Sequence, residues 1–122
     1  MSDLPRHGVF PLPDTLPADC RSIDLSDCDS RAELLQRIGS ALDFPDWYDA
    51  NFDALFDCLV DAEDIACLAF ANLQDFAARH AEDFTTLTLV LGAVCDVRAE
   101  LGQPVSFFLA GMDKNDAFAS GK

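Results

Sequence analysis

Three aspartates recur at every fourth position in residues 51–61, whose sequence is NFDALFDCLVD. They are Asp53, Asp57 and Asp61, and side chains four residues apart lie on the same face of an α-helix. Like charges at this spacing destabilise an isolated helix by roughly 0.2–0.5 kcal/mol per pair. The positive end of the helix dipole offsets this cost only in the first turn, which excludes Asp57 and Asp61. The spacing predicts an electronegative face that a cationic partner would stabilise.

Basic residues are missing around this row. No Lys or Arg occurs from position 38 through position 78, whereas nine acids do. A solvated helix usually interleaves bases with its acids. Two interpretations remain open on these grounds: a face that charge merely keeps soluble, or a surface shaped for a cationic cleft. The second kind of surface would attract its partner over a distance and lose affinity as the salt concentration rises.

The segment just before this helix contains Trp47 and Tyr48, the only Trp and the only Tyr of the chain. They lie in the sequence among acids, namely Asp46, Asp49 and Asp53. Aromatic rings beside charges that a partner can desolvate are typical of interface hot spots. The alternative is that a ring fills the core above Pro45, which explains one of the two rings better than both.

The composition indicates one small domain with a basic partner. The chain has 122 residues, of which half are apolar, and ten are Phe. A single core can therefore form without the support of disulfides or metal sites. Its formal net charge is -14, from 22 acids and eight bases. This balance argues against direct nucleic-acid binding, since phosphates require Lys and Arg. It favours a basic protein or a cation, with solubility or life in high salt as the alternative.

The five cysteines show no pairing pattern. Their number is odd and no two have CxxC spacing, so we expect neither a disulfide framework nor a zinc site. Cys58, Cys67 and Cys95 stand in apolar stretches, where a free thiol behaves as a small hydrophobe. The first eight residues lack the apolar region of a signal peptide, and apolar runs such as 65–71 are too short to span a bilayer. The expectation is a soluble cytoplasmic protein, with reduced cysteines, no cofactor and no membrane contact.

Strand and helix signals alternate along the chain. Ser30 and Glu33 have the capping-box spacing at a helix start, Pro45 bars that helix from continuing, and Asn51 is a plausible N-cap for the next. We expect strands near 23–25, at 65–71 and at 105–109, and helices from 30, from 51, near 73–77 and at 84–101. The order strand, helix, helix, strand, helix, helix, strand predicts an α/β domain with a parallel sheet and right-handed crossovers. Residues 1–19, rich in Pro, are expected to form an irregular arm or edge segment, residues 20–110 the domain, and residues 111–122 a loose tail.

The segment FPDWYDANFDALFDCLVD resembles the signature of the barstar family, a dense and specific motif. The resemblance extends in order and spacing of elements over residues 20–110. The matching positions are Phe44, Pro45, Tyr48, Asn51, Asp53, Ala54, Leu55, Asp57, Cys58 and Leu59.

This resemblance implies a small α/β domain with a three-stranded parallel sheet and about four helices, which inhibits a basic microbial ribonuclease as an antitoxin or immunity protein. The loop and helix of the signature would insert into the active site of the nuclease. Asp57 would take the place of an RNA phosphate, and Asp53 would contact neighbouring basic groups. Trp47 would pack on the rim of the site beside Tyr48, and Asn51 would hold the start of the helix.

Three positions depart from the family pattern. Asp49 replaces a Gly, which alters the loop, although Asp tolerates unusual backbone angles better than most residues. Phe56 replaces an aromatic that is often Trp and keeps a ring at the interface. Val97 stands where the family has a further interface carboxylate, between Asp96 and Glu100. These departures imply that the partner need not be barnase itself.

Two other classes of function compete with inhibition. Asp53 and Asp57 resemble paired carboxylates that bind Mg²⁺ or perform acid–base chemistry, but no third catalytic group accompanies them, and neither His7 nor His80 has local support. Asp57 would raise the pKa of the adjacent Cys58 thiol and weaken it as a nucleophile. We therefore expect no enzyme and no metal site. The remaining alternative is an acidic regulatory module that binds another basic protein.

Overall fold

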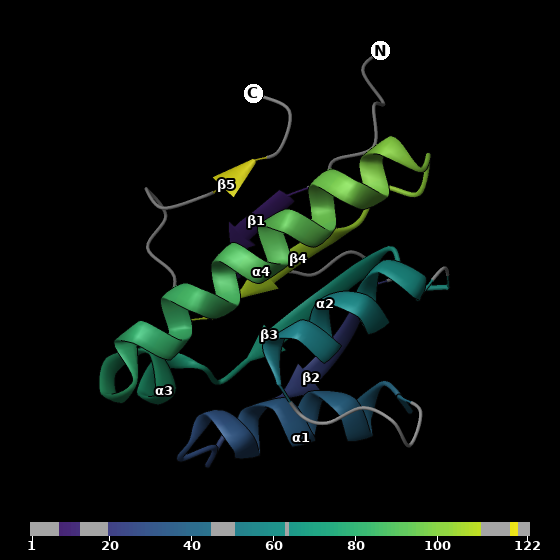
Figure 1. The fold of residues 1–122 in the computed structure, drawn as a ribbon. Coiled ribbons are helices and arrows are strands. Elements are labelled where there is room, and N and C mark those ends of the chain that lie inside the picture. Colours follow the sequence, from purple (N-terminus) through teal and green to yellow (C-terminus); the bar gives the residue numbers. More distant parts are fainter. Residues whose placement is uncertain (1–7, 13–19, 45–50, 63, 111–117, 120–122) are drawn as a thin grey trace.

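The computed structural model describes residues 8–12, 20–44, 51–62, 64–110 and 118–119. From β2 to β4, single strands are separated by pairs of helices, as the sequence predicts, and one further strand lies at each end of this series (Figure 1). The elements are β1 (Gly8–Pro11), β2 (Arg21–Asp24), α1 (Arg31–Ala41), α2 (Phe52–Asp61), β3 (Cys67–Ala71), α3 (Gln74–Arg79), α4 (Ala81–Glu100), β4 (Ser106–Leu109) and β5 (Phe118–Ala119).

The sheet contains the strand order β2-β3-β4-β1-β5. The first four of these strands are parallel to their neighbours, and β5 runs antiparallel to β1. The expected mixed α/β domain with a parallel sheet and four helices is confirmed, but the expected count of three strands is wrong. The additional parallel strand is β1, inside the Pro-rich segment. Its four residues are too few to show a strand period.

The helices lie on one side of the sheet. The crossovers from β2 to β3 and from β3 to β4 step in the same direction between parallel neighbours. Right-handed crossovers in one direction place all their helices on one face. Accordingly, α2 and α4 lie next to each other in front of the sheet (Figure 1).

The core lies between these helices and the sheet. Alternate strand residues point toward the helices, and they are large, apolar and fully or almost fully buried: Val9, Ile23, Leu68, Phe70, Phe107 and Leu109. In the register of the sheet, Val9 is level with Phe107 and Leu68, so β1 extends the same apolar layer. Burial of Val9 explains why this short strand joins the sheet in spite of the neighbouring prolines.

Helix α1 begins and ends on local signals that the sequence contains. The Ser30 hydroxyl accepts a hydrogen bond from the Glu33 N–H (3.2 Å), as the capping-box spacing predicts. The Glu33 carboxylate, in turn, accepts from the N–H of Asp29 (2.8 Å). At the other end, Asp43 adopts a left-handed conformation (φ 60). The Phe44 N–H donates a hydrogen bond to the Gly39 carbonyl over 3.0 Å. This turn ends α1 before Pro45.

The expectation that all five cysteines are reduced is wrong for two of them. Cys20 and Cys67 form a disulfide that joins positions 47 apart in the sequence. Arg21 pairs with Leu68 in the β2–β3 register, so the residues just before them are neighbours across the two strands. Linear spacing cannot show this register, so the sequence alone does not indicate the bond. Cys28, Cys58 and Cys95 remain free and buried.

Candidate interaction surface

The start of α2 is fixed by Asn51, as predicted. Its backbone is extended (φ -130, ψ 168), and its Oδ1 accepts a hydrogen bond from the Ala54 N–H over 2.7 Å. This bond satisfies one of the N–H groups that a helix leaves free at its first turn. Asn51 therefore sets where α2 begins and, through the helical repeat, which direction each Asp of the row faces.

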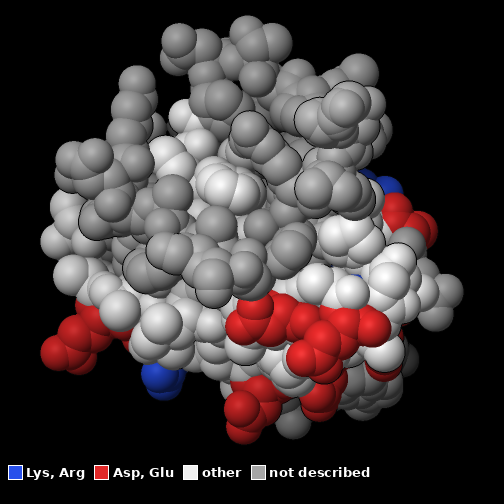
Figure 2. All heavy atoms as spheres, turned by 90° about the horizontal axis from the view of Figure 1, so that it is seen from above, with Lys and Arg blue, Asp and Glu red and all other residues white. Residues whose placement is uncertain are grey.

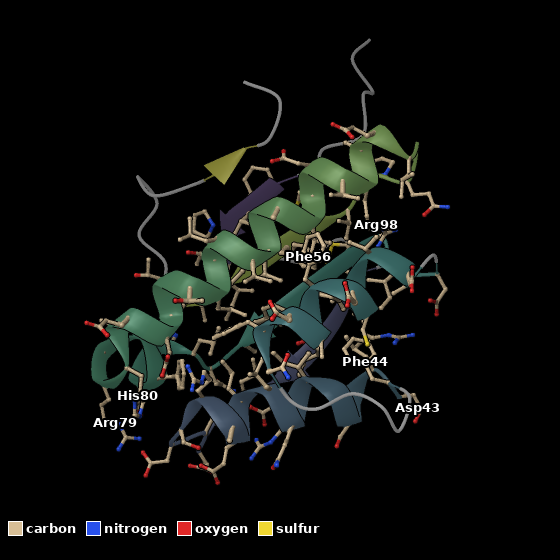
Figure 3. All side chains as sticks on the ribbon, in the orientation of Figure 1. Asp43, Phe44, Phe56, Arg79, His80 and Arg98 are labelled. Atoms are coloured by element: carbon tan, nitrogen blue, oxygen red, sulfur yellow. A yellow bond between two sulfur atoms is a disulfide. The ribbon has the colours of Figure 1, made fainter. Side chains whose placement is uncertain are left out.

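The buried side of α2 differs from the predicted stripe. Leu55 and Leu59 are fully buried, as expected, but Phe52 and Phe56 are only half-buried, and the core side is completed by Ala54 and Cys58. The buried face is thus centred on Ala54, Leu55, Cys58 and Leu59 instead of on the two Phe side chains. Phe56 lies on the side of α2 that faces α4 (Figure 3). Its ring packs against the core at the boundary and keeps an exposed edge.

The opposite side of α2 carries Asp53, Asp57 and Asp61, and all three are exposed. Salt bridges between described residues join Arg31 with Asp83 and Arg79 with Asp29, so neither involves α2. Figure 2 shows Asp and Glu side chains gathered on one part of the surface with no Lys or Arg among them. Within the described part of the chain, the negative charge of the row is therefore not neutralised by an ion pair.

The Cys58 thiol lies on the buried side of α2, next to the carboxylates of the row. Burial raises its pKa, and the neighbouring Asp57 and Asp61 carboxylates raise it further. The sequence-based prediction that Asp57 weakens this thiol as a nucleophile is confirmed in direction. Cys58 is therefore a packing residue of α2.

A buried arginine connects α2 to α4, and its role was not predicted from the sequence. Arg98 is 1% exposed. Its Nη1 donates to the Leu59 carbonyl in α2 over 3.4 Å, and its Nε donates to the Gln103 carbonyl over 3.0 Å. Figure 3 shows Arg98 near the end of α4, beside α2. A cation in the last turn of a helix is common, so only the tertiary contact distinguishes Arg98 from a surface residue.

The remaining predicted site residues are placed only in part. Trp47, Tyr48 and Asp49 lie outside the described residues, so their expected contacts stay predictions. On α4, Val97 is half-buried while its neighbours Asp96 and Glu100 are exposed. Asp96 and Glu100 are thus exposed carboxylates on a helix that contacts α2.

The described segments contain no group of three or more His, Cys, Asp or Glu side chains arranged to hold a metal ion. None of the helices formed by these segments is both long and apolar enough to cross a bilayer.

The acidic helix, its Asn cap and the parallel sheet behind it can be compared with known families. A family model described as Barstar (barnase inhibitor) matches residues 18–110. The chain belongs to the barstar family. The match includes β2, β3 and β4 with all four helices, and it leaves β1 and β5 outside. A search of curated proteins gave no match.

Membership of the barstar family confirms the resemblance that residues 44–59 suggested. Proteins of this family are inhibitors that bind ribonucleases of the barnase type, and they are not enzymes. Of the predicted partner-binding residues, Asn51, Asp53, Phe56 and Asp57 lie on or at the start of α2. Their role toward a partner stays a prediction.

Proposed function

We propose that this chain inhibits a basic microbial ribonuclease by inserting the acidic face of α2 and the preceding loop into the active site of the nuclease. The observation that carries this proposal is the row Asp53, Asp57 and Asp61, exposed and without ion pairs among described residues. In the free protein such a row costs helix stability. A cleft lined with Arg, Lys and His would turn that cost into favourable contacts.

The chemistry of the row suits mimicry of RNA. A ribonuclease site binds successive phosphates, and carboxylates spaced one helical turn apart present negative charges at regular intervals. We assign Asp57, in the middle of the row, to the central phosphate position and Asp53 to the neighbouring basic groups and backbone donors. Trp47, Tyr48 and Asp49 are assigned to the rim of the nuclease site, with Phe56 beside them.

Rigidity of the acidic face supports the same function. Asn51 caps α2 at one end, Leu55 and Leu59 anchor it to the core, and Arg98 holds the Leu59 carbonyl near the other end. A surface that is already ordered loses little conformational freedom when it binds. The inhibitor is therefore preorganised as a plug. The competing function, an acidic module that regulates another basic protein, uses the same charge but has no need of a phosphate-like spacing.

Titration of a ribonuclease tests this proposal. The chain is added to barnase, and then to the basic proteins that it captures from extracts of its source cells, while cleavage of a fluorogenic RNA is followed. We expect cleavage to stop at one inhibitor per nuclease, with an association rate that falls as NaCl is raised.

A matched variant separates specific insertion from attraction by charge. Asp53→Asn with Asp57→Asn removes two charges at the centre of the row, whereas Asp75→Asn with Asp83→Asn removes two exposed or half-exposed charges on α3 and α4. Only the first pair should abolish inhibition. Equal loss from both pairs, or binding of a basic protein without any effect on its RNase activity, would favour the regulatory module instead.

A further inference from the structure

A cleft lies beside the acidic row, between the end of α1 and the end of α2. Its volume is about 380 Å³, at the small end of the range for ligand sites. Apolar groups form most of its wall: Leu42, Phe44, Cys58, Ala62 and Ile65. Phe44 lies between α1 and α2 in Figure 3, where the turn after α1 directs it.

Two carboxylates complete the lining of this cleft. Asp61 ends α2, and Asp64 follows it shortly before β3, and both side chains are exposed. The other lining residues are buried or half-buried. None of the described residues that line the cleft is basic. In its described part, the cleft therefore combines a concave apolar wall with negative charge.

This combination selects one class of occupant. An anion would be repelled by Asp61 and Asp64. A neutral apolar group would pack against the wall, but it would remove water from two carboxylates and offer them no hydrogen-bond or charge partner in return. A long cationic side chain satisfies both parts, because the methylene stem of Lys or Arg covers apolar surface while its charged end stays at the polar edge.

We propose that this cleft receives one Lys or Arg side chain of the basic partner protein, with its stem against Phe44 and Ile65 and its cation between Asp61 and Asp64. The inference rests on the proposed function for its choice of partner. It adds a second anchoring point to the acidic row, apart from the Asp53 and Asp57 positions that are assigned to the nuclease active site.

The position of the cleft fits the same docked partner. Asp61 belongs both to the row on α2 and to the lining of the cleft. Successive members of the row are one helical turn apart, roughly 5–6 Å between Cβ atoms. A protein seated over Asp57 would thus have neighbouring side chains within reach of the cleft, and no separate docking event is needed.

Small probes test the cleft without any nuclease. The ¹⁵N-labelled chain is titrated with n-butylguanidinium, with its neutral analogue butylurea, and with guanidinium, which has no stem. We expect n-butylguanidinium to shift the amide signals of Leu42, Phe44, Cys58, Ala62 and Ile65. It should bind several-fold more tightly than either of the other two probes.

Two kinds of variant locate the binding. Asp61→Asn with Asp64→Asn should weaken n-butylguanidinium binding by roughly three- to tenfold, the range for two exposed ion pairs. Ala62→Leu should block it by filling the cleft, since the backbone at Ala62 (φ -83, ψ 76) accepts a larger side chain. Asp53→Asn with Asp57→Asn removes the same charge from the same helix outside the cleft and should leave this binding nearly unchanged.

Some results would overturn the inference. They are equal binding of butylurea, shifts spread over the whole acidic face, or equal weakening by the Asp53 and Asp57 pair. Failure of the cleft is distinct from failure of the proposed function. A chain that inhibits the nuclease but binds no probe loses only the cleft assignment, whereas a chain that binds the probe but inhibits no ribonuclease loses the proposed function and with it the partner.

Discussion

Arg98 on α4 donates a hydrogen bond to the backbone carbonyl of Leu59, 39 positions earlier in the chain and near the end of α2. The guanidinium is almost fully buried, so this contact links the two helices inside the core. It restrains the helix that carries Asp57 and Asp61 from the side opposite to the proposed partner. The orientation of the acidic row thus depends on a residue that lies outside it.

Replacement of Arg98 by Met should destabilise the fold. Met keeps most of the buried stem but removes the Arg98 donor from the Gln103 carbonyl and from the Leu59 carbonyl, which keeps the Ala62 N–H as a partner. A hydrogen bond from a charged donor contributes about 1.5–3 kcal/mol. Urea unfolding measures the free energy of unfolding. Arg31→Met is the matched control, because its salt bridge with Asp83 is largely exposed and should contribute about 1 kcal/mol or less. Equal effects of the two substitutions would contradict a structural role for Arg98.

Local chemistry explains how much of the fold was predictable. Asn51 and Ser30 act as caps because a side-chain oxygen beside free N–H groups needs no distant partner. The strands β2, β3 and β4 were predictable because each contains a short apolar segment, which is also a local signal. The four helices also follow from their apolar periods and end signals, such as Gly102 with its positive φ after α4.

Features that depend on register or tertiary contact were not predictable from the sequence. The disulfide of Cys20 with Cys67 requires the alignment of β2 with β3. The strand β1 requires the apolar layer beside Phe107, and the burial of Cys58 depends on the tertiary packing around α2. Charge and spacing indicated the acidic row, but its lack of ion pairs to described residues depends on where the arginines lie in the fold.

Asp57→Ala should weaken the complex with the ribonuclease far more than Asp61→Ala. We expect a loss of about 2–5 kcal/mol for Asp57, the range for truncated charge pairs buried in protein complexes, a barstar complex among them. For Asp61, at the edge of the interface, we expect about 1 kcal/mol or less. Stopped-flow association and dissociation rates give both values. If the two losses were equal and small, insertion would be wrong and only a diffuse attraction would remain.

The cysteines allow a direct count. Under oxidising conditions the unfolded chain should show three reactive thiols, from Cys28, Cys58 and Cys95, and five after reduction. Closing a loop between positions 47 apart should stabilise the fold by about 4 kcal/mol on the chain-entropy estimate. Thiol titration and urea unfolding of Cys20→Ser with Cys67→Ser measure the two quantities. Cys28→Ser is the control that leaves the disulfide in place, and five thiols before reduction would show that the bond does not form.

In the folded protein, the thiols should also react slowly at neutral pH. Burial raises the pKa of Cys95 to about 12, and its thiol donates to the Val105 carbonyl over 3.4 Å. Only the thiolate is nucleophilic, so modification of Cys95 should require opening of the fold. Modification of native protein at the rate of the unfolded chain would contradict this burial.

The Asp24 carboxylate should make stability depend on acid pH. Asn72 donates to its Oδ1 over 2.8 Å and the Ser26 N–H donates over 3.0 Å, and these hydrogen bonds lower the pKa of Asp24 below its ordinary value of 3.8. Because the folded pKa is depressed, the stabilising effect is present above the ordinary value and is lost as the pH falls through the depressed pKa. In Asn72→Gly, which keeps the positive φ of this position, NMR titration should show the pKa of Asp24 moving back up. The difference in unfolding free energy between wild type and Asp24→Asn should shrink as acid is added, and a difference independent of pH would show that these hydrogen bonds do not favour the ionised carboxylate.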